Sequence, residues 1–452
     1  MAKLKNSTLF YYSLTDVPVM MSIFPVAVFV PRFYASDVGV PLALVGTYIL
    51  VTRIFDVITD PLMGYVSDHT RSRFGRRRPW VLLSVPIMML GIYRLFLPPE
   101  GADGLYMLLW LFVLGIGTTM MLIPYYAWGA ELSTDYFERT RVTGWRAGAG
   151  VIGQLSAQLI PAIAMAFFAF GGSANVLYLV GITMLVLMPL CVIATVWKTP
   201  EPEIQIRSAV SPLEGLKAMG SNGPFLRLVA SFMVSQLGLN ITTPLYLFFV
   251  ADVLGAEDRA IYMLSIFYIT NLCSIPFWVW FGGKIGKHRA YLSAFFLIAL
   301  AHPFYLLLGP GDFWLMTPVT IVTGFAAGGF SSALPNSMKA DVIDLDTLQT
   351  GENRAAQFFS AWSFAQKIPA FMGASIAMFG LALWGFDAAP GAVNGEAELF
   401  GLRFLFSTFP SLFFIGAAII VWNYSITEDR HAEIRAGIEA NRAGDPQHRA
   451  EA

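Results

Sequence analysis

The sequence predicts an all-α membrane protein, with twelve transmembrane helices arranged in two six-helix bundles. Three observations lead to this prediction. The composition is 56% hydrophobic and only 13% charged, whereas an ordinary soluble domain is about 25% charged. Twelve long apolar runs follow one another along the chain, and one long polar interval divides them into two sets of six. A chain of this kind, with a mean hydropathy of +0.61, has little soluble mass.

A helix needs about 20 apolar residues to cross a bilayer. The expected spans are 8–33, 41–66, 79–98, 104–131, 143–170, 174–197, 225–253, 259–283, 289–309, 312–338, 354–385 and 400–424. Strands of a membrane β-barrel are about ten residues long and alternate in polarity, so these longer, continuous runs predict helices. The first run contains Asp16 and Pro18 and has no A-x-A cleavage site, which favours a retained helix over a signal peptide.

The polar interval after the sixth run contains four prolines and charges of both signs. We therefore expect an N-terminal bundle at 1–198, a cytoplasmic linker at 199–224, a C-terminal bundle at 225–426 and a cytoplasmic tail at 427–452. Of the 29 Lys and Arg residues, 22 lie at the N-terminus, in the loops after even-numbered runs and in the tail. The positive-inside rule then places both termini in the cytoplasm.

A weak internal repeat supports two related halves. The second run ends in GYVSDHTRSRFGRRRPW and the eighth in GGKIGKHRAY, so each half has a short, basic, glycine-containing loop at the same place. Two related halves with sites near their interface are typical of transporters. We expect a multi-pass protein of the cell membrane, in a bacterium the inner membrane, that works as a monomer on a small-molecule substrate.

Composition also limits partners and cofactors. A net charge of −1 offers no global field for nucleic acid. The two cysteines, Cys191 and Cys273, lie in separate apolar runs, so neither a metal-ligand spacing nor a disulfide framework is indicated. We expect lipid as the surrounding partner and no cofactor other than a coupling ion, sodium or a proton.

Ionisable side chains near the middle of a bilayer are costly, at roughly 2.5–3.5 kcal/mol each on insertion scales, and mark function. Six such side chains stand out in the expected spans: Asp16, Arg53, Asp56, Asp60, Arg146 and Lys367.

Three of these residues share one helical face. Arg53, Asp56 and Asp60 are spaced by three and four residues, so they lie on the same side of a helix. An Arg53–Asp56 ion pair that only fixes helix packing would explain two of them but not Asp60. Two carboxylates with one partial counter-charge predict a site for a monovalent cation, sodium or a proton.

The other three charges favour a polar substrate with several hydroxyl groups. Arg146 and Lys367 can donate hydrogen bonds to it and Asp16 can accept them. The fourth run supplies aromatic faces in IPYYAWGAEL, with Tyr125, Tyr126 and Trp128. The alternatives are snorkelling of Arg146 to the interface and the use of the aromatic residues as interface anchors.

The basic loop after the second run sets topology through Arg71, Arg73, Arg76, Arg77 and Arg78. Its glycines add a second possibility. Gly64 and Gly75 permit close approach of neighbouring segments, and Asp68 can bridge to a neighbouring helix end. We therefore expect a cytoplasmic gate formed by Gly64, Asp68, Arg71 and Gly75.

Several segments resemble a known family. GYVSDHTRSRFGRR resembles the loop motif of the major facilitator superfamily. RIFDVITDPLMGYVSD, IPYYAWGAELSTDYFERTRVTGWR and ADVIDLDTLQTGENRAAQFFSAWSFAQK resemble the glycoside–pentoside–hexuronide:cation symporters, whose best-known member is the melibiose permease. The resemblance covers both halves of the chain.

The resemblance implies the major facilitator fold, alternating access and cation-coupled symport of a sugar or glycoside. It implies that Asp56 and Asp60 bind the coupling cation, with Thr59 and Thr119 as nearby oxygen donors. It also implies a sugar site lined by Asp16, Tyr126, Trp128, Arg146 and Lys367, with coupling through Lys367 and Arg53.

The sequence departs from the family pattern at three positions. Leu122 replaces an acid that helps to hold the sugar, Tyr126 replaces a tryptophan that stacks on it, and Thr59 replaces an asparagine beside the second aspartate. The first change disfavours galactosides, and the third leaves sodium and proton coupling both open. A less polar, lysolipid-like or otherwise amphipathic solute is the alternative substrate.

Other classes of protein fit less well. An intramembrane enzyme would need a Ser–His pair or a metal cluster within the spans. Of the five histidines only His302 lies near one, and no partner is evident. A sensor without transport activity usually adds a soluble signalling domain, and we expect none here. We therefore predict a transporter and not an enzyme.

Overall fold

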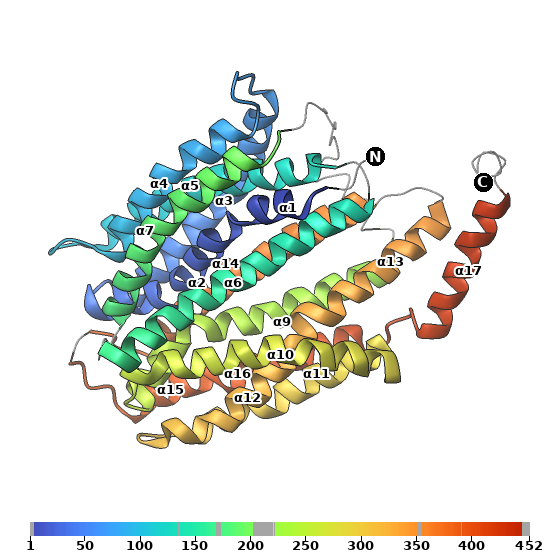
Figure 1. The fold of residues 1–452 in the computed structure, drawn as a ribbon. Coiled ribbons are helices and arrows are strands. Elements are labelled where there is room, and N and C mark those ends of the chain that lie inside the picture. The colour runs from blue at the N-terminus through green and yellow to red at the C-terminus, as the bar shows by residue number, and fades with distance from the viewer. Residues whose placement is uncertain are drawn as a thin grey trace. The chain divides into compact units, whose positions relative to one another are not determined.

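The computed structural model describes residues 4–133, 136–168, 173–201, 220, 222–350, 355–389 and 391–444. In these ranges the chain is helical and contains no strand (Figure 1). Twelve segments are long and apolar enough to cross a membrane, which confirms the predicted number of spans. Most of the expected linker, 202–219 and 221, lies outside the described residues.

The described helices follow one another with short connections. Those before the linker are α1 (Asn6–Ser13), α2 (Asp16–Arg32), α3 (Leu42–His69), α4 (Arg78–Phe96), α5 (Gly104–Glu131), α6 (Tyr136–Phe168) and α7 (Ser173–Lys198). Those after it are α9 (Gly223–Phe248), α10 (Ala260–Ile285), α11 (Lys287–Ala301), α12 (Met316–Ala327), α13 (Leu334–Thr350), α14 (Ala355–Leu383), α15 (Glu396–Phe406), α16 (Thr408–Val421) and α17 (Glu428–Gly444).

Single spans are often built from more than one helical piece. The first span, Asn6–Asp37, joins α1, α2 and the π-helical turn η1 (Phe33–Asp37). The tenth, Asp312–Thr350, joins α12 and α13 through the π-helical turn η6 (Gly328–Ala333). Irregular backbone at membrane depth is tolerated only where protein groups satisfy it, so these interruptions indicate where polar side chains are needed.

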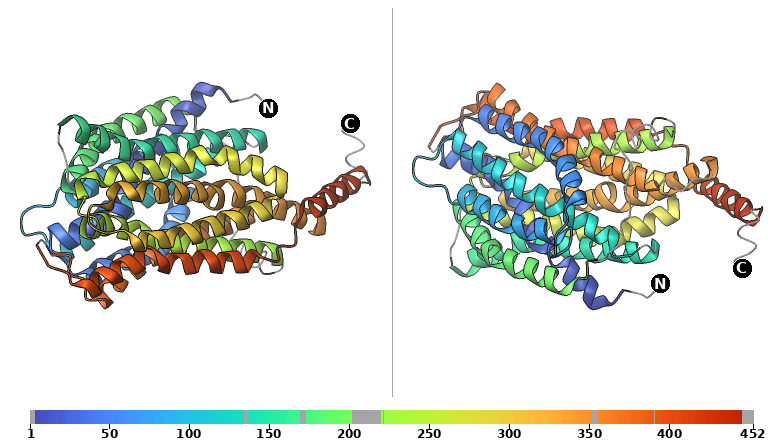
Figure 2. Two further views of the ribbon diagram at one scale, coloured as in Figure 1. Left: turned by 90° about the horizontal axis from the view of Figure 1, so that it is seen from below. Right: turned by 90° about the horizontal axis from the view of Figure 1, so that it is seen from above.

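The helices group into two compact units. The first consists of Met1–Arg207, Thr243–Ser265 and Ala374–Leu402, and the second of Ser208–Thr242, Ile266–Gly373 and Arg403–Ala452. In the first unit α2 packs on α6 and α7, and α5 packs on α3 and α4. The views in Figures 1 and 2 show α4, α5 and α7 as neighbours in this unit.

Within the first unit, two helix ends have the same local form. α2 passes into η1, and α9 passes into a second five-residue π-helical turn, η2 (Phe249–Val253). Arg32, at the end of α2, is buried and pairs with Asp252 of η2 at 2.5 Å. This correspondence between the first helix of each half is a second internal repeat, which the sequence patterns alone did not reveal.

The core of the second unit is apolar. Phe225, Phe232, Tyr291, Phe295, Phe330 and Phe414 are completely buried there, together with residues of α13, α14 and α17. No hydrophobic effect drives membrane helices together, so their association depends on van der Waals packing, and these buried side chains supply such contacts in the second unit. The C-terminal helix α17 belongs to this core through Ile434 and Ile438.

Candidate functional site

A pair of carboxylates on α3 faces α5 in the first unit. The Thr119 hydroxyl of α5 donates a hydrogen bond of 2.9 Å to Oδ1 of Asp60. One turn earlier on α5, Gly115 lies against Asp56, because a β-carbon there would be 3.1 Å from Asp56 Oδ1. Both carboxylates therefore lie along one helix–helix contact, as their spacing predicts.

Arg53 partly balances this pair. Its Nη1 atom lies 3.0 Å from Asp56 Oδ2. The arginine side chain is 43% exposed and that of Asp56 is 19% exposed, so the ion pair is partly open to solvent. Thr59 also lies here, and its hydroxyl bonds to the Phe55 carbonyl of the same helix at 3.2 Å.

The donor set of this cluster suits a small, hard cation. Carboxylate and hydroxyl oxygens are the ligands that such cations prefer. Among the described residues, no three His, Cys, Asp or Glu side chains gather into a conventional metal site. A cation here would therefore be held by two carboxylates, with hydroxyl and carbonyl oxygens completing its shell.

A second polar cluster surrounds Asp16 at the start of α2. Asp16 Oδ2 accepts hydrogen bonds from the Tyr125 hydroxyl at 2.8 Å and from Arg146 Nε at 3.1 Å. The Arg146 guanidinium lies over the Tyr126 ring, 3.7 Å from its centroid. The structure thus brings together Asp16, Arg146 and Tyr126, which the sequence predicted as substrate ligands.

Exposure differs sharply within the second cluster. The side chain of Asp16 is 3% exposed and that of Arg146 is 22% exposed. Tyr125 is completely buried and Tyr126 is half-buried. Arg146 and Tyr126 are therefore the members best placed to meet a solute.

Two other expected substrate ligands are Trp128 and Lys367. Trp128 is completely buried, and its indole donates to the Pro200 carbonyl at 2.9 Å. Lys367 belongs to the second unit, where it is exposed on α14.

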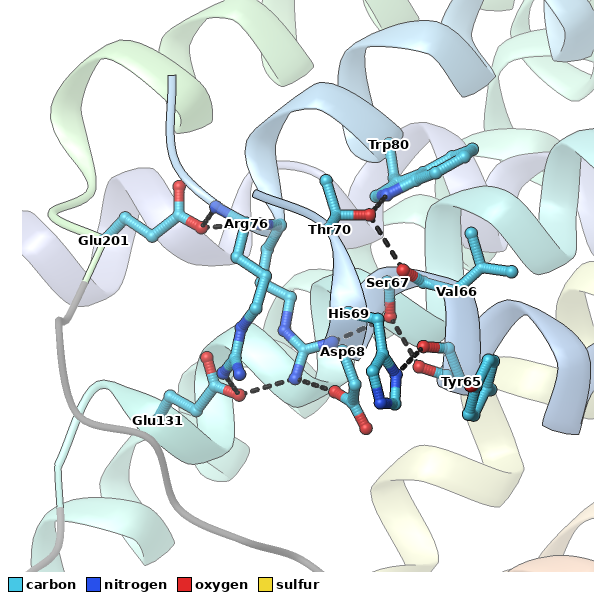
Figure 3. A network of polar contacts seen from close by, with 12 residues as sticks. Tyr65, Val66, Ser67, Asp68, His69, Thr70, Arg76, Trp80, Glu131 and Glu201 are labelled. Carbon is cyan, nitrogen blue, oxygen red and sulfur yellow. Dashed lines mark hydrogen bonds and ion pairs between the residues drawn. The ribbon is translucent and has the colours of Figure 1, made fainter. Parts of the chain in front are cut away.

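The loop between α3 and α4 carries an ion-pair network (Figure 3). Arg77 Nη2 lies 2.5 Å from Asp68 Oδ1 and 2.6 Å from Glu131 Oε1. Nη2 of Arg76 reaches the same Glu131 oxygen at 2.6 Å. Burial opposes the charged guanidinium of Arg77, but Glu131 and Asp68 outweigh it and raise the Arg77 pKa. Asp68 thus bridges to Arg77 at the start of α4, and Arg77 in turn pairs with Glu131 of α5.

The glycine of this loop has a specific structural role. Gly75 has φ +101°, a conformation that favours glycine. A β-carbon there would overlap the Glu201 carboxylate. This carboxylate accepts hydrogen bonds from the backbone N–H of Arg76 (Figure 3) and from that of Arg77. Gly75 therefore lets the chain leaving α7 close onto this loop.

The remaining two expected gate residues contribute less. Arg71 is exposed. Gly64 faces α5 at Ile123, where a β-carbon would make an ordinary contact of 3.8 Å.

Sequence reasoning missed four residues of these networks: Tyr12, Arg77 as a buried ion-pair partner, Glu131 and Glu201. One signal was available for Glu131, since it is an acid at the end of an apolar span next to a basic loop. Glu201 and Tyr12 meet their partners through long-range packing, which periodicity does not report.

A chain with twelve spans, and with ionisable clusters inside them, has the organisation of a membrane transporter. Comparison with known sequences agrees. The chain matches the family described as MFS/sugar transport protein over residues 11–428, and it belongs to this family. It is therefore a multi-pass transporter of the cell membrane and not an enzyme.

Relatives in this family are named as symporters and transporters. An uncharacterized symporter of Synechocystis sp. is 25% identical, covering 92% of this chain and 93% of its own length. The isoprimeverose transporter of Lactiplantibacillus pentosus is 27% identical, covering 86% and 81%. The sodium-dependent lysophosphatidylcholine symporter 1 of Gallus gallus is 26% identical, covering 90% and 82%.

A solved structure shows the same fold. The nucleoside transporter NupG superposes with a TM-score of 0.66, over 93% of this chain and 99% of its own, at 14% sequence identity. The expectation of a major facilitator fold is thereby confirmed.

Proposed function

We propose that this protein is a cation-coupled symporter that moves a sugar or glycoside across the cell membrane by alternating access. The observation that carries the proposal is the separation of two polar clusters inside the first unit. One contains paired carboxylates and a hydroxyl, and the other contains an arginine, an acid and an aromatic ring. A coupled transporter needs one site for each of two different solutes.

The cation site is assigned to Asp56 and Asp60, with Thr119 and Thr59 as further oxygen donors. Relatives named as symporters support coupling in general, and one is named as sodium-dependent. Sodium and protons both remain candidates, because either neutralises a pair of carboxylates. Arg53 competes with the cation for Asp56.

The substrate site is assigned to Asp16, Tyr126 and Arg146, with Trp128 and Lys367 as further members and Lys367 as the link between substrate and cation. The resemblance to glycoside–pentoside–hexuronide symporters supports a sugar. An arginine that can donate hydrogen bonds beside an aromatic face suits a sugar ring. The relative that transports isoprimeverose is consistent with this class.

The proposed organisation follows the sequence. It has bundles at 1–198 and 225–426, a cytoplasmic linker at 199–224 and a cytoplasmic tail at 427–452. Both termini are cytoplasmic, and the protein functions as a monomer. Asp68, Arg71, Gly64 and Gly75 belong to a cytoplasmic gate. The Arg77 and Glu131 contacts support the part assigned to Asp68.

A second candidate is transport of an amphipathic, lysolipid-like solute. Leu122, in place of an acid on α5, makes the site less polar, and several relatives are named as sodium-dependent lysophosphatidylcholine symporters. The Asp16–Arg146 pair favours a polar solute over this alternative.

Uptake by purified protein in proteoliposomes tests the proposal. The solutes are radiolabelled isoprimeverose, melibiose, a glucuronide and lysophosphatidylcholine, each with an inward sodium gradient, an inward proton gradient or no gradient. We expect accumulation of a sugar only with a gradient. Equal uptake in all three conditions would show a uniporter, and uptake of lysophosphatidylcholine alone would favour the second candidate.

Variants assign the two sites in the same assay. Asp56→Asn and Asp60→Asn should abolish gradient-driven accumulation, whereas Asp258→Asn, at an exposed carboxylate in the same unit, should not. Full accumulation by Asp60→Asn would remove Asp60 from the cation site. Lys367→Ala should impair coupling or binding in a protein that still inserts, and unaltered kinetics would assign Lys367 to packing.

A further inference from the structure

The first spanning helix is interrupted immediately before Asp16. α1 ends at Ser13 and α2 begins at Asp16, although both belong to one span. At the joint, the Val17 N–H bonds to the Leu14 carbonyl, three residues back, at 3.2 Å. The end of a helix leaves carbonyl groups without intrahelical partners, and inside a membrane such groups must be satisfied by protein.

Three hydroxyl groups take up carbonyls of the last turn of α1. The Phe10 carbonyl accepts from Ser13 at 2.9 Å and the Tyr11 carbonyl from Thr195 at 2.7 Å, and the Tyr125 hydroxyl, whose one proton is shared with Asp16, lies 2.7 Å from the Tyr12 carbonyl. Two of these donors come from other helices, α7 and α5. The interruption is therefore held by specific side chains.

Tyr12 and Tyr125 hold each other in a reciprocal arrangement. The Tyr12 hydroxyl donates to the Tyr125 carbonyl at 2.8 Å, and the Tyr125 hydroxyl lies 2.7 Å from the Tyr12 carbonyl. Their rings are stacked, with centroids 4.6 Å apart. Both side chains are completely buried, so neither can touch a solute in this conformation.

The same Tyr125 hydroxyl connects the pair to the substrate cluster. It lies 2.8 Å from Asp16 Oδ2, and that oxygen also accepts from Arg146. Any displacement of Tyr125 would therefore change the orientation of Asp16, and through it that of the partly exposed Arg146. The route runs from the helix joint to the guanidinium in three contacts.

Two glycines make room for this arrangement. A β-carbon at Gly129 of α5 would overlap the Tyr12 hydroxyl, and one at Gly153 of α6 would overlap the Val17 carbonyl beside Asp16. The close approach of both helices to the joint indicates a tightly packed element.

We infer that Tyr12 and Tyr125 are positioning residues of the substrate site, which hold the α1–α2 joint so that Asp16 fixes Arg146 toward the solute. Asp16 then acts on the solute through Arg146. This inference rests on the proposed function for its effect on transport, but the positioning of the joint can be measured without any solute.

The variants are Tyr12→Phe and Tyr125→Phe, which keep the buried rings. The matched control is Tyr34→Phe, because Tyr34 is also completely buried in the first unit and its hydroxyl donates to the Leu95 carbonyl at 3.0 Å. Amide hydrogen exchange of residues 14–19 in purified protein reports the joint. We expect severalfold faster exchange there in the two variants and wild-type exchange there in Tyr34→Phe.

Transport gives a second readout. With the sugar accumulated by the wild type among isoprimeverose, melibiose and the glucuronide, Tyr125→Phe should raise KM roughly tenfold, as expected for loss of a hydrogen bond to a charged group. The maximal rate should change little. Tyr125→Phe combined with Asp16→Asn should have the KM of Asp16→Asn alone, because both act through Arg146.

Wild-type exchange at the joint in both variants would overturn the inference, as would equal changes in Tyr34→Phe. Additive effects of Tyr125→Phe and Asp16→Asn on KM would also overturn it. If the wild type transports none of the sugars, the proposed function fails, and the exchange measurement still decides whether Tyr12 and Tyr125 hold the joint.

Discussion

The Thr119 hydroxyl donates a 2.9 Å hydrogen bond to Asp60, and this bond joins α5 to the carboxylate pair on α3. A hydroxyl in this position can donate a hydrogen bond to the carboxylate when no cation is bound. When a cation is present, it can rotate so that its oxygen faces the cation. The contact therefore makes Thr119 a sensitive test of the cation site.

Thr119→Val should raise the half-saturating concentration of the coupling cation roughly tenfold, because the variant removes an oxygen ligand of the bound cation, and about 1.4 kcal/mol of lost binding corresponds to a tenfold change. Thr119→Ser keeps the hydroxyl and should remain close to wild type. Uptake measured against cation concentration in proteoliposomes checks both. Equal cation dependence in Thr119→Val and the wild type would place the cation away from Thr119.

Arg53 gives a prediction of the opposite sign. Its guanidinium lies 3.0 Å from Asp56 and must be displaced or shared when a cation binds there. Arg53→Gln should therefore lower the half-saturating cation concentration severalfold. The change should be modest, because the arginine is 43% exposed and exposed ion pairs contribute about 0–1 kcal/mol.

The control for this variant is Arg94→Gln, because Arg94 lies in the last turn of α4 in the first unit. It should leave the cation dependence unchanged. Weaker cation binding in Arg53→Gln would instead mean that Arg53 organises the site, for example by holding Asp56 in place.

The number and approximate position of the membrane helices could be predicted from the sequence, because such helices are recognised by their length and hydropathy. The spacing of Asp56 and Asp60 placed both on one face of α3, and the contacts with Gly115 and Thr119 agree with that. Local periodicity cannot show where one helix meets another. Trp128 shows this limit. Its place in the sequence suggests an aromatic face for a ligand, and only the fold shows that its indole is bonded to the Pro200 carbonyl.

Glu131 illustrates the same limit. Its position at the end of an apolar span next to a basic loop suggests an ion pair, but it does not show that the carboxylate pairs with both Arg76 and Arg77. The interruption before Asp16 was hidden for a related reason, because the hydroxyls that permit it come from α5 and α7, more than a hundred residues away. Sequence patterns describe single elements, and these sites depend on contacts between elements.

Removal of the Glu131 charge should destabilise the network beside the loop. The side chains of Arg77 and Glu131 are 3% and 6% exposed, and breaking a buried pair costs about 3–5 kcal/mol. We expect Glu131→Gln to lower the free energy of unfolding by about 3 kcal/mol, at the lower end of this range, because Asp68 still pairs with Arg77. Thermal unfolding of purified protein measures the change.

The double variant Glu131→Gln/Arg77→Gln should be more stable than the sum of the two single changes predicts, since it leaves no uncompensated buried charge. Arg430→Gln, at an ion pair whose partners are 57% and 64% exposed, should have almost no effect. Strict additivity of Glu131→Gln and Arg77→Gln would show that the two residues do not act as a pair.

The C-terminal helix α17 gives the last prediction. In the second unit it packs on α13, with Ile434 1% exposed and Ile438 8% exposed. His431 Nε2 lies 3.1 Å from Asp344 and 3.4 Å from Asp341, and Asp341 is also paired with Lys287 at 2.7 Å. The tail that the sequence left without a role thus contacts a spanning segment through apolar side chains and through the polar contacts of His431 with Asp341 and Asp344.

Ile434→Asp should release α17 from α13, because a buried apolar side chain is replaced by a charge that must reach water. Limited proteolysis should then cleave the chain within 427–444 under conditions where the wild type resists. Ala436→Asp introduces the same charge at an exposed position of the same helix and should leave the wild-type pattern intact. If Ile434→Asp resists cleavage as the wild type does, α17 is held mainly by the contacts of His431, and cleavage of His431→Ala would then be expected instead.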